Sequence, residues 1–210
     1  SKDLLATINQ YHQVPATLKD IPAGNEYAYL ETPVTKVLVA PYDAKQIYMA
    51  QISNLDKKYD PAIEPIRALY DEYFGGGMNS IVFQEMRETR GLAYSAWASI
   101  MPPSYLKYPY VLRTQIATQN DKMAQAIDAF DEIINNMPES EAAFKLAKDG
   151  LTNRLRTERI IKGDIIWSYI NAQDLGQNVD PRIKLYNDIQ NMSLKDIVDF
   201  QKQWVKGRTY

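Results

Sequence analysis

The sequence contains no cysteine. Disulfide bonds, thiolate nucleophiles and cysteine metal ligands are therefore all excluded. Histidine is almost absent too, because His12 is its single occurrence. A catalytic zinc site takes two or three imidazoles with a carboxylate, and the chain has neither a His-x-x-Glu-His nor a His-Glu-x-x-His string. The sequence predicts no metal site and no self-sufficient metalloenzyme, although a Ser–Lys nucleophile pair stays open.

Strong net charge and long apolar runs are also missing. The formal net charge is −2, so no basic field draws nucleic acid and no acidic tail is present. Apolar runs fall short of the ~18 residues that a membrane span requires. The chain opens at Ser1 with neither an initiator methionine nor a signal peptide. We interpret it as a fragment of a longer protein.

Hydrophobic patterning predicts an α+β fold in one domain over residues 35–210. Residues 1–34 carry a short helix and then a proline-rich stretch, and are interpreted as a linker or N-terminal extension. Alternating or β-branched runs predict an antiparallel sheet of about four strands. These strand-like runs cover residues 36–40, 45–53, 92–101 and 110–119.

Helical periodicity dominates the rest, especially after residue 120, and predicts a helix-rich C-terminal half whose helices cover one face of the sheet. The predicted helix starts are Asn79 or Ser80, Asp180, and the Ser193–Asp196 pair. Asp164 is predicted to cap a further helix, which carries an apolar stripe. The members of this stripe are Ile165, Ile166, Tyr169 and Ile170.

Three consecutive glycines, residues 75–77, invite a phosphate-binding interpretation. A P-loop requires Gly-Lys-Ser/Thr, and here Met78-Asn79-Ser80 follows without the lysine. A dinucleotide fingerprint must follow a parallel strand, whereas the preceding element has a helical pattern. A turn between two helices that needs positive φ is the favoured interpretation.

Arg87 and Tyr94 are the candidate binding residues. Arg87 falls near the end of a predicted helix, Gly91 turns the chain, and Tyr94 lies on the predicted strand that follows. This order can bring a guanidinium and a phenol to one side of the sheet, where two donors would hold a peptide carbonyl or a developing oxyanion. In the alternative, Arg87 pairs with Glu85 or Glu88 and Tyr94 packs in the core.

The segment "GGGMNSIVFQEMRETRGLAYSAWA" resembles the non-catalytic, C-terminal-type domains of the pitrilysin/insulinase family of inverted-zincin zinc metallopeptidases. Those domains carry a glycine-rich turn followed by a pattern close to Ser-x-Leu-Phe-x-x-Ile/Met-Arg-x-x-Arg-Gly-Leu-Ala-Tyr-Ser, with Val82 replacing the leucine here. The matching positions are Ser80, Phe83, Met86, Arg87, Arg90, Gly91, Leu92, Ala93, Tyr94 and Ser95. The order of strands and helices extends the resemblance over residues 36–204.

The resemblance implies a zinc metalloendopeptidase as the parent protein, with its zinc in a separate catalytic domain and none in this fragment. The two halves of such a parent enclose an unfolded peptide substrate, and Arg87 and Tyr94 match positions that reach toward that substrate. Other domains of the same chain are the implied partners. Family domains continue into a closing edge strand, so we expect this fragment to stop before its last strand.

Two other functions remain possible on the sequence. The family includes members that have lost catalysis and serve as scaffold or protein-interaction subunits, and this chain is compatible with that role. A stand-alone nucleotide-binding domain rests on the glycines alone. Exported bacterial relatives favour a periplasmic location.

Overall fold

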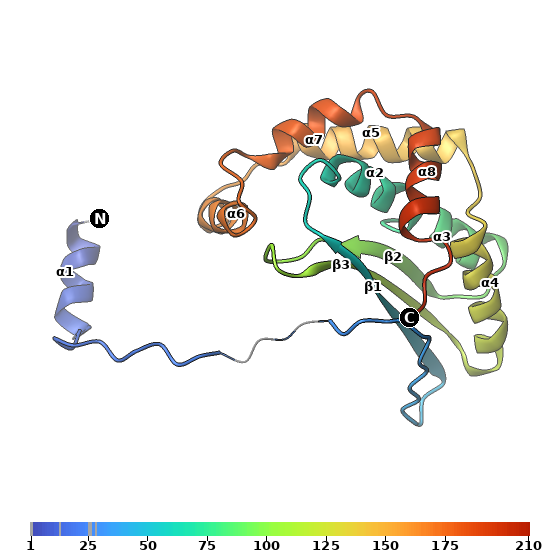
Figure 1. The fold of residues 1–210 in the computed structure, drawn as a ribbon, viewed down its shortest axis with the longest axis horizontal. Helices are drawn as coiled ribbons and strands as arrows, with labels where there is room; N and C mark the ends of the chain where they lie inside the picture. Colours follow the sequence, from blue (N-terminus) through green and yellow to red (C-terminus); the bar gives the residue numbers. More distant parts are fainter. Residues whose placement is uncertain (1, 13, 25–26, 28) are drawn as a thin grey trace.

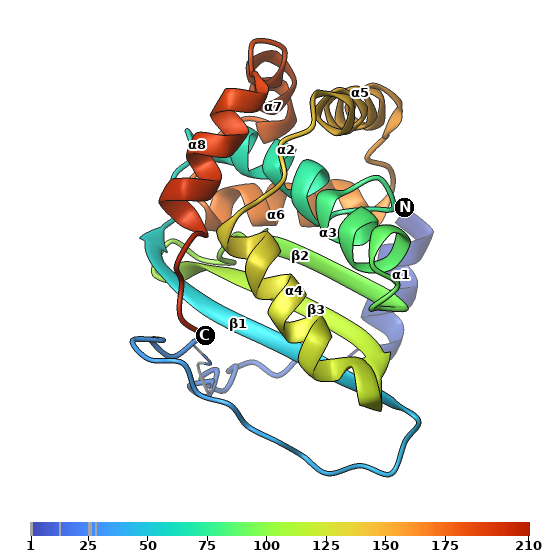
Figure 2. The same cartoon turned by 90° about the vertical axis from the view of Figure 1, so that its right-hand side faces the viewer.

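The computed structural model describes residues 2–12, 14–24, 27 and 29–210. Its core is one antiparallel sheet with strand order β1-β3-β2, covered on one face by helices (Figures 1 and 2). The strands are β1 (Gln46–Lys58), β2 (Ser95–Met101) and β3 (Pro109–Gln119). The α+β class and the packing of helices on one face of the sheet (Figure 2), both predicted from the sequence, are confirmed.

The described part of the chain forms three strands, whereas the sequence predicted about four. Residues 36–40 are not a strand: Val37, Leu38 and Val39 are exposed, and the backbone N–H of Lys36 donates to the carbonyl of Tyr210 at 2.9 Å. A β-branched run has strand propensity, but it becomes a strand only where a neighbour pairs with it. β1 instead pairs along its length with β3.

The helical layer consists of five well-packed helices, together with two short helical segments that lead into β2. The five are α2 (Glu64–Phe74), α4 (Met123–Asn135), α5 (Glu141–Thr157), α7 (Pro181–Ile189) and α8 (Leu194–Trp204). α2, α4 and α8 meet the inner face of the sheet, whereas α5 and α7 pack on α2. In the aromatic core, Tyr70 stacks on Phe74 and contacts Phe200. The predicted capping box of α8 is present, with Ser193 and Asp196 bonded to each other's backbone.

Two helices lie outside this packing. α1 (Lys2–Tyr11) stands apart from the domain, and α6 (Gly163–Asp174) sits at the end of the helical layer (Figure 1). All described residues of α1 are exposed. The apolar stripe predicted around Ile165 and Tyr169 does not face the core, because both side chains are exposed.

The triple glycine ends α2, but the predicted positive φ is wrong. Gly75 has φ −142°, and the positive-φ glycines are Gly91, Gly176 and Gly207. Gly75 is required for close approach instead: a Cβ there would lie 2.2 Å from the carbonyl oxygen of Ala98 on β2. The glycine therefore lets the end of α2 touch the backbone of the sheet.

A buried ionic network joins α2 to β2. The Arg67 guanidinium donates to Glu64 at 2.9 Å, to Asp71 at 2.8 Å and to the Ile100 carbonyl at 3.0 Å. Asp71 also accepts from the backbone N–H of Ile100 and from the hydroxyl of Ser99, both at 2.9 Å. Each buried charge thus has a partner, as burial demands.

Burial raises the pKa of Asp71 to about 6, although Arg67, the Ile100 N–H and Ser99 each oppose the shift. A carboxyl whose folded-state pKa lies above its unfolded value of 3.8 takes up a proton preferentially in the folded state. Its contribution to stability therefore rises as the pH falls from about 7 toward 4. The other ionisable groups of this network are Glu64 on the same helix and Tyr110 on β3, whose hydroxyl donates to Glu64 at 2.6 Å.

We expect Asp71→Asn to remove this pH dependence. The free energy of unfolding of the unmodified chain, relative to the variant, should increase by about 1 kcal/mol between pH 7 and pH 5. Urea unfolding of both proteins at pH 7, 6 and 5 measures the difference. Asp180 and Asp196 have lowered pKa values and titrate below this window, so they do not obscure it. A constant difference across the three pH values would contradict the raised pKa.

Candidate functional site

Arg87 lies on an unusual stretch of helix. Ser80 caps α3 (Ile81–Phe83) by accepting from the N–H of Phe83, and the helix continues directly into the π-helical turn η1 (Gln84–Thr89). The wider turn shows in the bond from the N–H of Arg90 to the carbonyl of Glu85. π-Helical turns are rare and occur frequently at functional sites, because they change the direction in which side chains point.

The chain then reverses tightly toward the sheet. Gly91 has φ +58°, a conformation that a side chain would strain. The N–H groups of Leu92 and Ala93 both donate to the carbonyl of Met86, at 2.9 and 3.2 Å. The N–H of Tyr94 then donates to Ala117 of β3 at 2.8 Å. This turn returns Tyr94 to the side of the helix that carries Arg87.

The structure brings the two predicted residues together by stacking. The Arg87 guanidinium carbon lies 5.7 Å from the centre of the Tyr94 ring and 5.1 Å from that of Phe83. Tyr94 is 70% exposed, so it does not pack in the core. Arg87 also forms a long ion pair with Glu88 at 3.6 Å, one of the two acidic partners that the alternative interpretation named.

This arrangement leaves hydrogen-bond donors available. A guanidinium has five N–H donors in a rigid plane, and stacking on a ring engages its face rather than its edge. The Tyr94 side chain is 70% exposed, so its hydroxyl is accessible to a ligand. Two fixed donors of this kind match the two lone pairs of a peptide carbonyl.

A small cavity of about 220 Å³ adjoins Tyr94 at the end of the sheet. Lys122, from the 3-10 turn η2 (Asn120–Lys122) after β3, lies on its rim and donates to the carbonyl of Gly91 at 3.2 Å. Sequence analysis did not single out this cation. No local pattern connects it to Tyr94, because only the β2–β3 pairing brings the two segments together.

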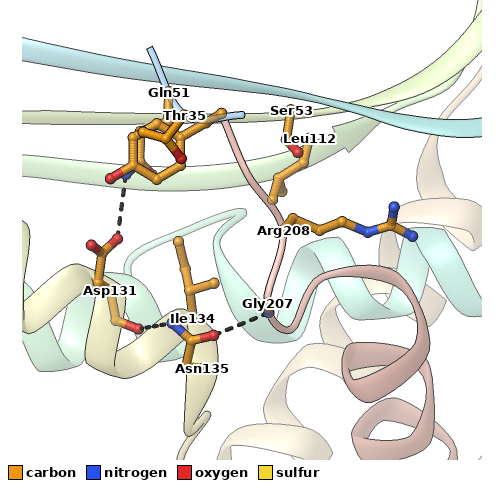
Figure 3. A pocket seen from close by; sticks show the side chains of 10 residues that line it. Thr35, Gln51, Ser53, Leu112, Asp131, Ile134, Asn135, Gly207 and Arg208 are labelled. Carbon is orange, nitrogen blue, oxygen red and sulfur yellow. Dashed lines mark hydrogen bonds between the residues drawn. The ribbon is translucent and has the colours of Figure 1, made fainter. Parts of the chain in front are cut away.

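A second cavity, of about 300 Å³, lies between β1, α4 and the C-terminal residues (Figure 3). Gln51 donates to Asp131 at 3.5 Å, and Asn135 bridges the Asp131 carbonyl and the Gly207 N–H. Ser53 donates to the carbonyl of Thr209 at 2.6 Å. These bonds tie the C-terminal segment to the sheet, so we assign this cavity a packing role.

The residues do not fit a zinc ion. Throughout the described ranges, no three His, Cys, Asp or Glu side chains come close enough together to hold a metal. His12 lies exposed beyond the end of α1, far along the chain from the carboxylates of the domain. No step of a zinc mechanism is therefore assigned to this chain's own residues. Among the described helices, none has the length and apolar character to cross a membrane.

Comparison with protein families decides what the chain is. The family model described as "Peptidase M16 inactive domain" matches residues 15–151, which is more than half of the chain. The chain belongs to the M16 peptidase family. It is an inactive domain of that family, the pitrilysin/insulinase metallopeptidases predicted from the sequence. No curated protein sequence matches it.

Solved structures share the M16 fold. A protease from Helicobacter pylori is 13% identical, with a TM-score of 0.68, and the match covers 97% of this chain and 49% of that one. The inactive peptidase domain of a putative zinc protease from Bordetella parapertussis is 11% identical, with a TM-score of 0.62, and the match covers 82% of this chain and 94% of that one.

The periplasmic protease PqqL from Escherichia coli is 13% identical, with a TM-score of 0.58, and the match covers 97% of this chain and 22% of that one. This chain therefore spans about half of the Helicobacter chain and less than a quarter of PqqL, whereas it is comparable in length to the separate Bordetella domain.

Proposed function

We propose that this M16 inactive domain helps to enclose and position an unfolded peptide, which a zinc site in another domain of the same protein hydrolyses. The observation that carries the proposal is the exposed pair in which the Arg87 guanidinium stacks 5.7 Å above the Tyr94 ring. The π-helical turn beneath Arg87 and the cavity beside Tyr94 support it. The resemblance to a periplasmic protease favours a periplasmic location for the complete protein.

The chain's own residues would act by binding and orientation. The Tyr94 hydroxyl and the edge of the Arg87 guanidinium donate to a carbonyl of the substrate backbone, which is common to every peptide sequence. Stacking stabilises the guanidinium orientation by about 0.5–1 kcal/mol at an exposed site. Because donors act most strongly on an oxygen that gains negative charge, the pair contributes more to turnover than to substrate binding. The zinc of the companion domain supplies the attacking water and most of the charge stabilisation when it is bound.

We expect Tyr94→Phe to lower kcat/KM of the complete protease by about 10- to 100-fold on an unstructured peptide. The change removes one hydroxyl and keeps the ring under Arg87. Loss of one donor of this kind costs on the order of 10²–10³ in rate, and the zinc carries part of that effect here. Arg87→Lys keeps the charge, loses the planar donor edge, and should also lower kcat/KM.

Two variants serve as matched controls. Tyr42→Phe removes the hydroxyl of another exposed tyrosine, and Arg113→Lys changes another stacked guanidinium, which lies 5.9 Å above Trp97. Both should leave kcat/KM unchanged. Zinc content and melting temperature are measured for every variant. The proposal is wrong if Tyr94→Phe and Arg87→Lys keep full activity, or lose it only through unfolding. A complete protein without zinc or peptidase activity would favour a scaffold role.

A further inference from the structure

α6 presents to solvent an apolar face that the described part of the chain leaves exposed. None of its residues, all of which the structure describes, is buried. Its two aromatic side chains are largely exposed, although such large apolar groups are usually buried: Trp167 is 64% exposed and Tyr169 is 65% exposed. The other exposed apolar side chains of the helix are Ile165, Ile166 and Ile170. We call these five residues the α6 face.

A helix of this length requires packing to be stable. Isolated helices shorter than about 12–15 residues are marginal in water, and most helical stability in proteins comes from burying an apolar face. The N-cap residue of α6, Lys162, has a positive φ, and its side chain makes no capping hydrogen bond. Burying the α6 face against a partner would therefore stabilise this helix.

The size of the α6 face indicates what kind of partner fits. Five such side chains expose on the order of 500 Å². A free second copy needs about 800 Å² per partner for a stable interface. Interfaces between domains of one chain bury about 600–1,500 Å² in total, because covalent linkage raises the effective concentration to the millimolar range. The face thus matches a linked domain better than a free partner.

The chemistry of the α6 face agrees with this assignment. The helix carries two acidic residues, Asp164 at its start and Asp174 at its end, and no basic residue. Interface centres are depleted of charge and enriched in aromatic residues, and tryptophan and tyrosine are the residue types that contribute most to binding energy. Trp167 and Tyr169 lie between the two acidic ends of the helix.

We propose that the α6 face is the surface on which the companion, zinc-bearing domain of the same protein docks. This inference rests on the proposed function. The lengths of solved structures with the same fold support the presence of a companion domain. This chain covers only 43% to 49% of three of those chains, so more than half of each lies outside the match. Because the α6 face is apolar and carries no basic residue, the surface of the companion domain that contacts it is also apolar and poor in charge. Docking at α6 would fix the position of the Arg87–Tyr94 pair relative to the companion domain.

Amide hydrogen exchange tests the docking. Peptides covering residues 163–174 are followed in the complete protease and in the isolated 210-residue chain. Exchange should be slower in the complete protease by on the order of tenfold or more, because docking stabilises the helix against local opening. Trp167→Glu should abolish this protection in the complete protease and leave the melting temperature of the isolated chain unchanged. Leu38→Glu, at a residue 94% exposed outside α6, is the control and should keep the protection.

Every other outcome overturns the proposal. If the amides of residues 163–174 exchange equally fast and without protection in the complete protease and in the isolated chain, no domain covers α6. Protection that rises with the concentration of the isolated chain would assign the face to a second copy. Protection in the isolated chain at all concentrations would assign it to another segment of this chain, such as α1. The readout needs no activity, so docking can hold even if the Arg87 and Tyr94 variants are fully active.

Discussion

Arg67→Met should lower the free energy of unfolding by about 3–5 kcal/mol, which is a large part of the total stability of a domain of this size. The change removes the guanidinium that pairs with Glu64 at 2.9 Å and Asp71 at 2.8 Å. Both carboxylates are mostly buried, with side-chain exposures of 20% and 16%. Both carboxylates would lose their positively charged partner while staying buried, and that uncompensated burial dominates the loss.

The comparison with Arg154→Met isolates the effect of burial. Arg154 pairs with Glu72 and so links α5 to α2, but its side chain is 52% exposed. Exposed pairs contribute at most about 1 kcal/mol, so this control should lose little. Chemical unfolding of both variants at pH 7 measures the contrast. Equal midpoints would show that the buried network stabilises the fold no more than a surface pair does.

The double variant Arg67→Met/Asp71→Asn should lose less than the two single changes added together. The neutral amide introduced at position 71 would no longer place a bare charge beside the missing guanidinium, although its oxygen can still accept from the Ile100 N–H. Acidic pH should also reduce the destabilisation caused by Arg67→Met. Protonation of Asp71 removes the unpaired charge, so the deficit of the single Arg67→Met variant should shrink between pH 7 and pH 5.

Local signals in the sequence located several helix ends, but the predicted cap at Asp164 is wrong, because the N-cap of α6 is Lys162. Ser80 and Asp180 accept hydrogen bonds from the backbone two or three residues ahead, as their positions predicted, and Ser193 and Asp196 form the expected capping box. Such caps need only a few neighbouring residues, so the sequence is enough to find them. The same holds for the turn at Gly91, where positive φ demands glycine.

Features that depend on distant neighbours were not predictable in the same way. Residues 36–40 have strand propensity, but the described chain offers them no neighbouring strand. The apolar pattern of α6 identified a helix, yet periodicity cannot say whether the partner of a face lies in the same domain. The π-helical turn under Arg87 and the approach of Lys122 to Gly91 arise from the connection of the helix to the sheet.

The Arg87–Tyr94 pair has one feature that the local sequence predicts and one that depends on distant neighbours. Order along the chain predicted that Arg87 and Tyr94 would come close, and the structure places them in contact. The sequence did not reveal that the contact is a stack, because ring orientation depends on how the reverse turn meets β3. It follows that the rigidity of this turn, and of the elements beneath it, decides how well the two donors are held. Gly75 is the position at which that rigidity can be tested.

Gly75→Ala should lower the free energy of unfolding by about 3 kcal/mol, at the upper end of the cost of overpacking. The new Cβ would lie 2.2 Å from the carbonyl oxygen and 2.4 Å from the backbone nitrogen of Ala98. A flexible side chain can move away from such a contact, but Ala98 is in the middle of β2 and its backbone is held by the pairing with Thr114. Either α2 or β2 must therefore shift.

Gly77→Ala provides the matched control within the same triple glycine. Its Cβ would meet no atom within 4 Å, and its φ is not positive. This change should be neutral or should stabilise the chain by up to about 1 kcal/mol, because alanine reduces the freedom of the unfolded chain. Chemical unfolding and near-ultraviolet circular dichroism of both variants measure the contrast. Equal stability would show that α2 does not rest on the backbone of β2. In that case α2 could not hold in place the sheet and helix ends that carry Tyr94 and Arg87.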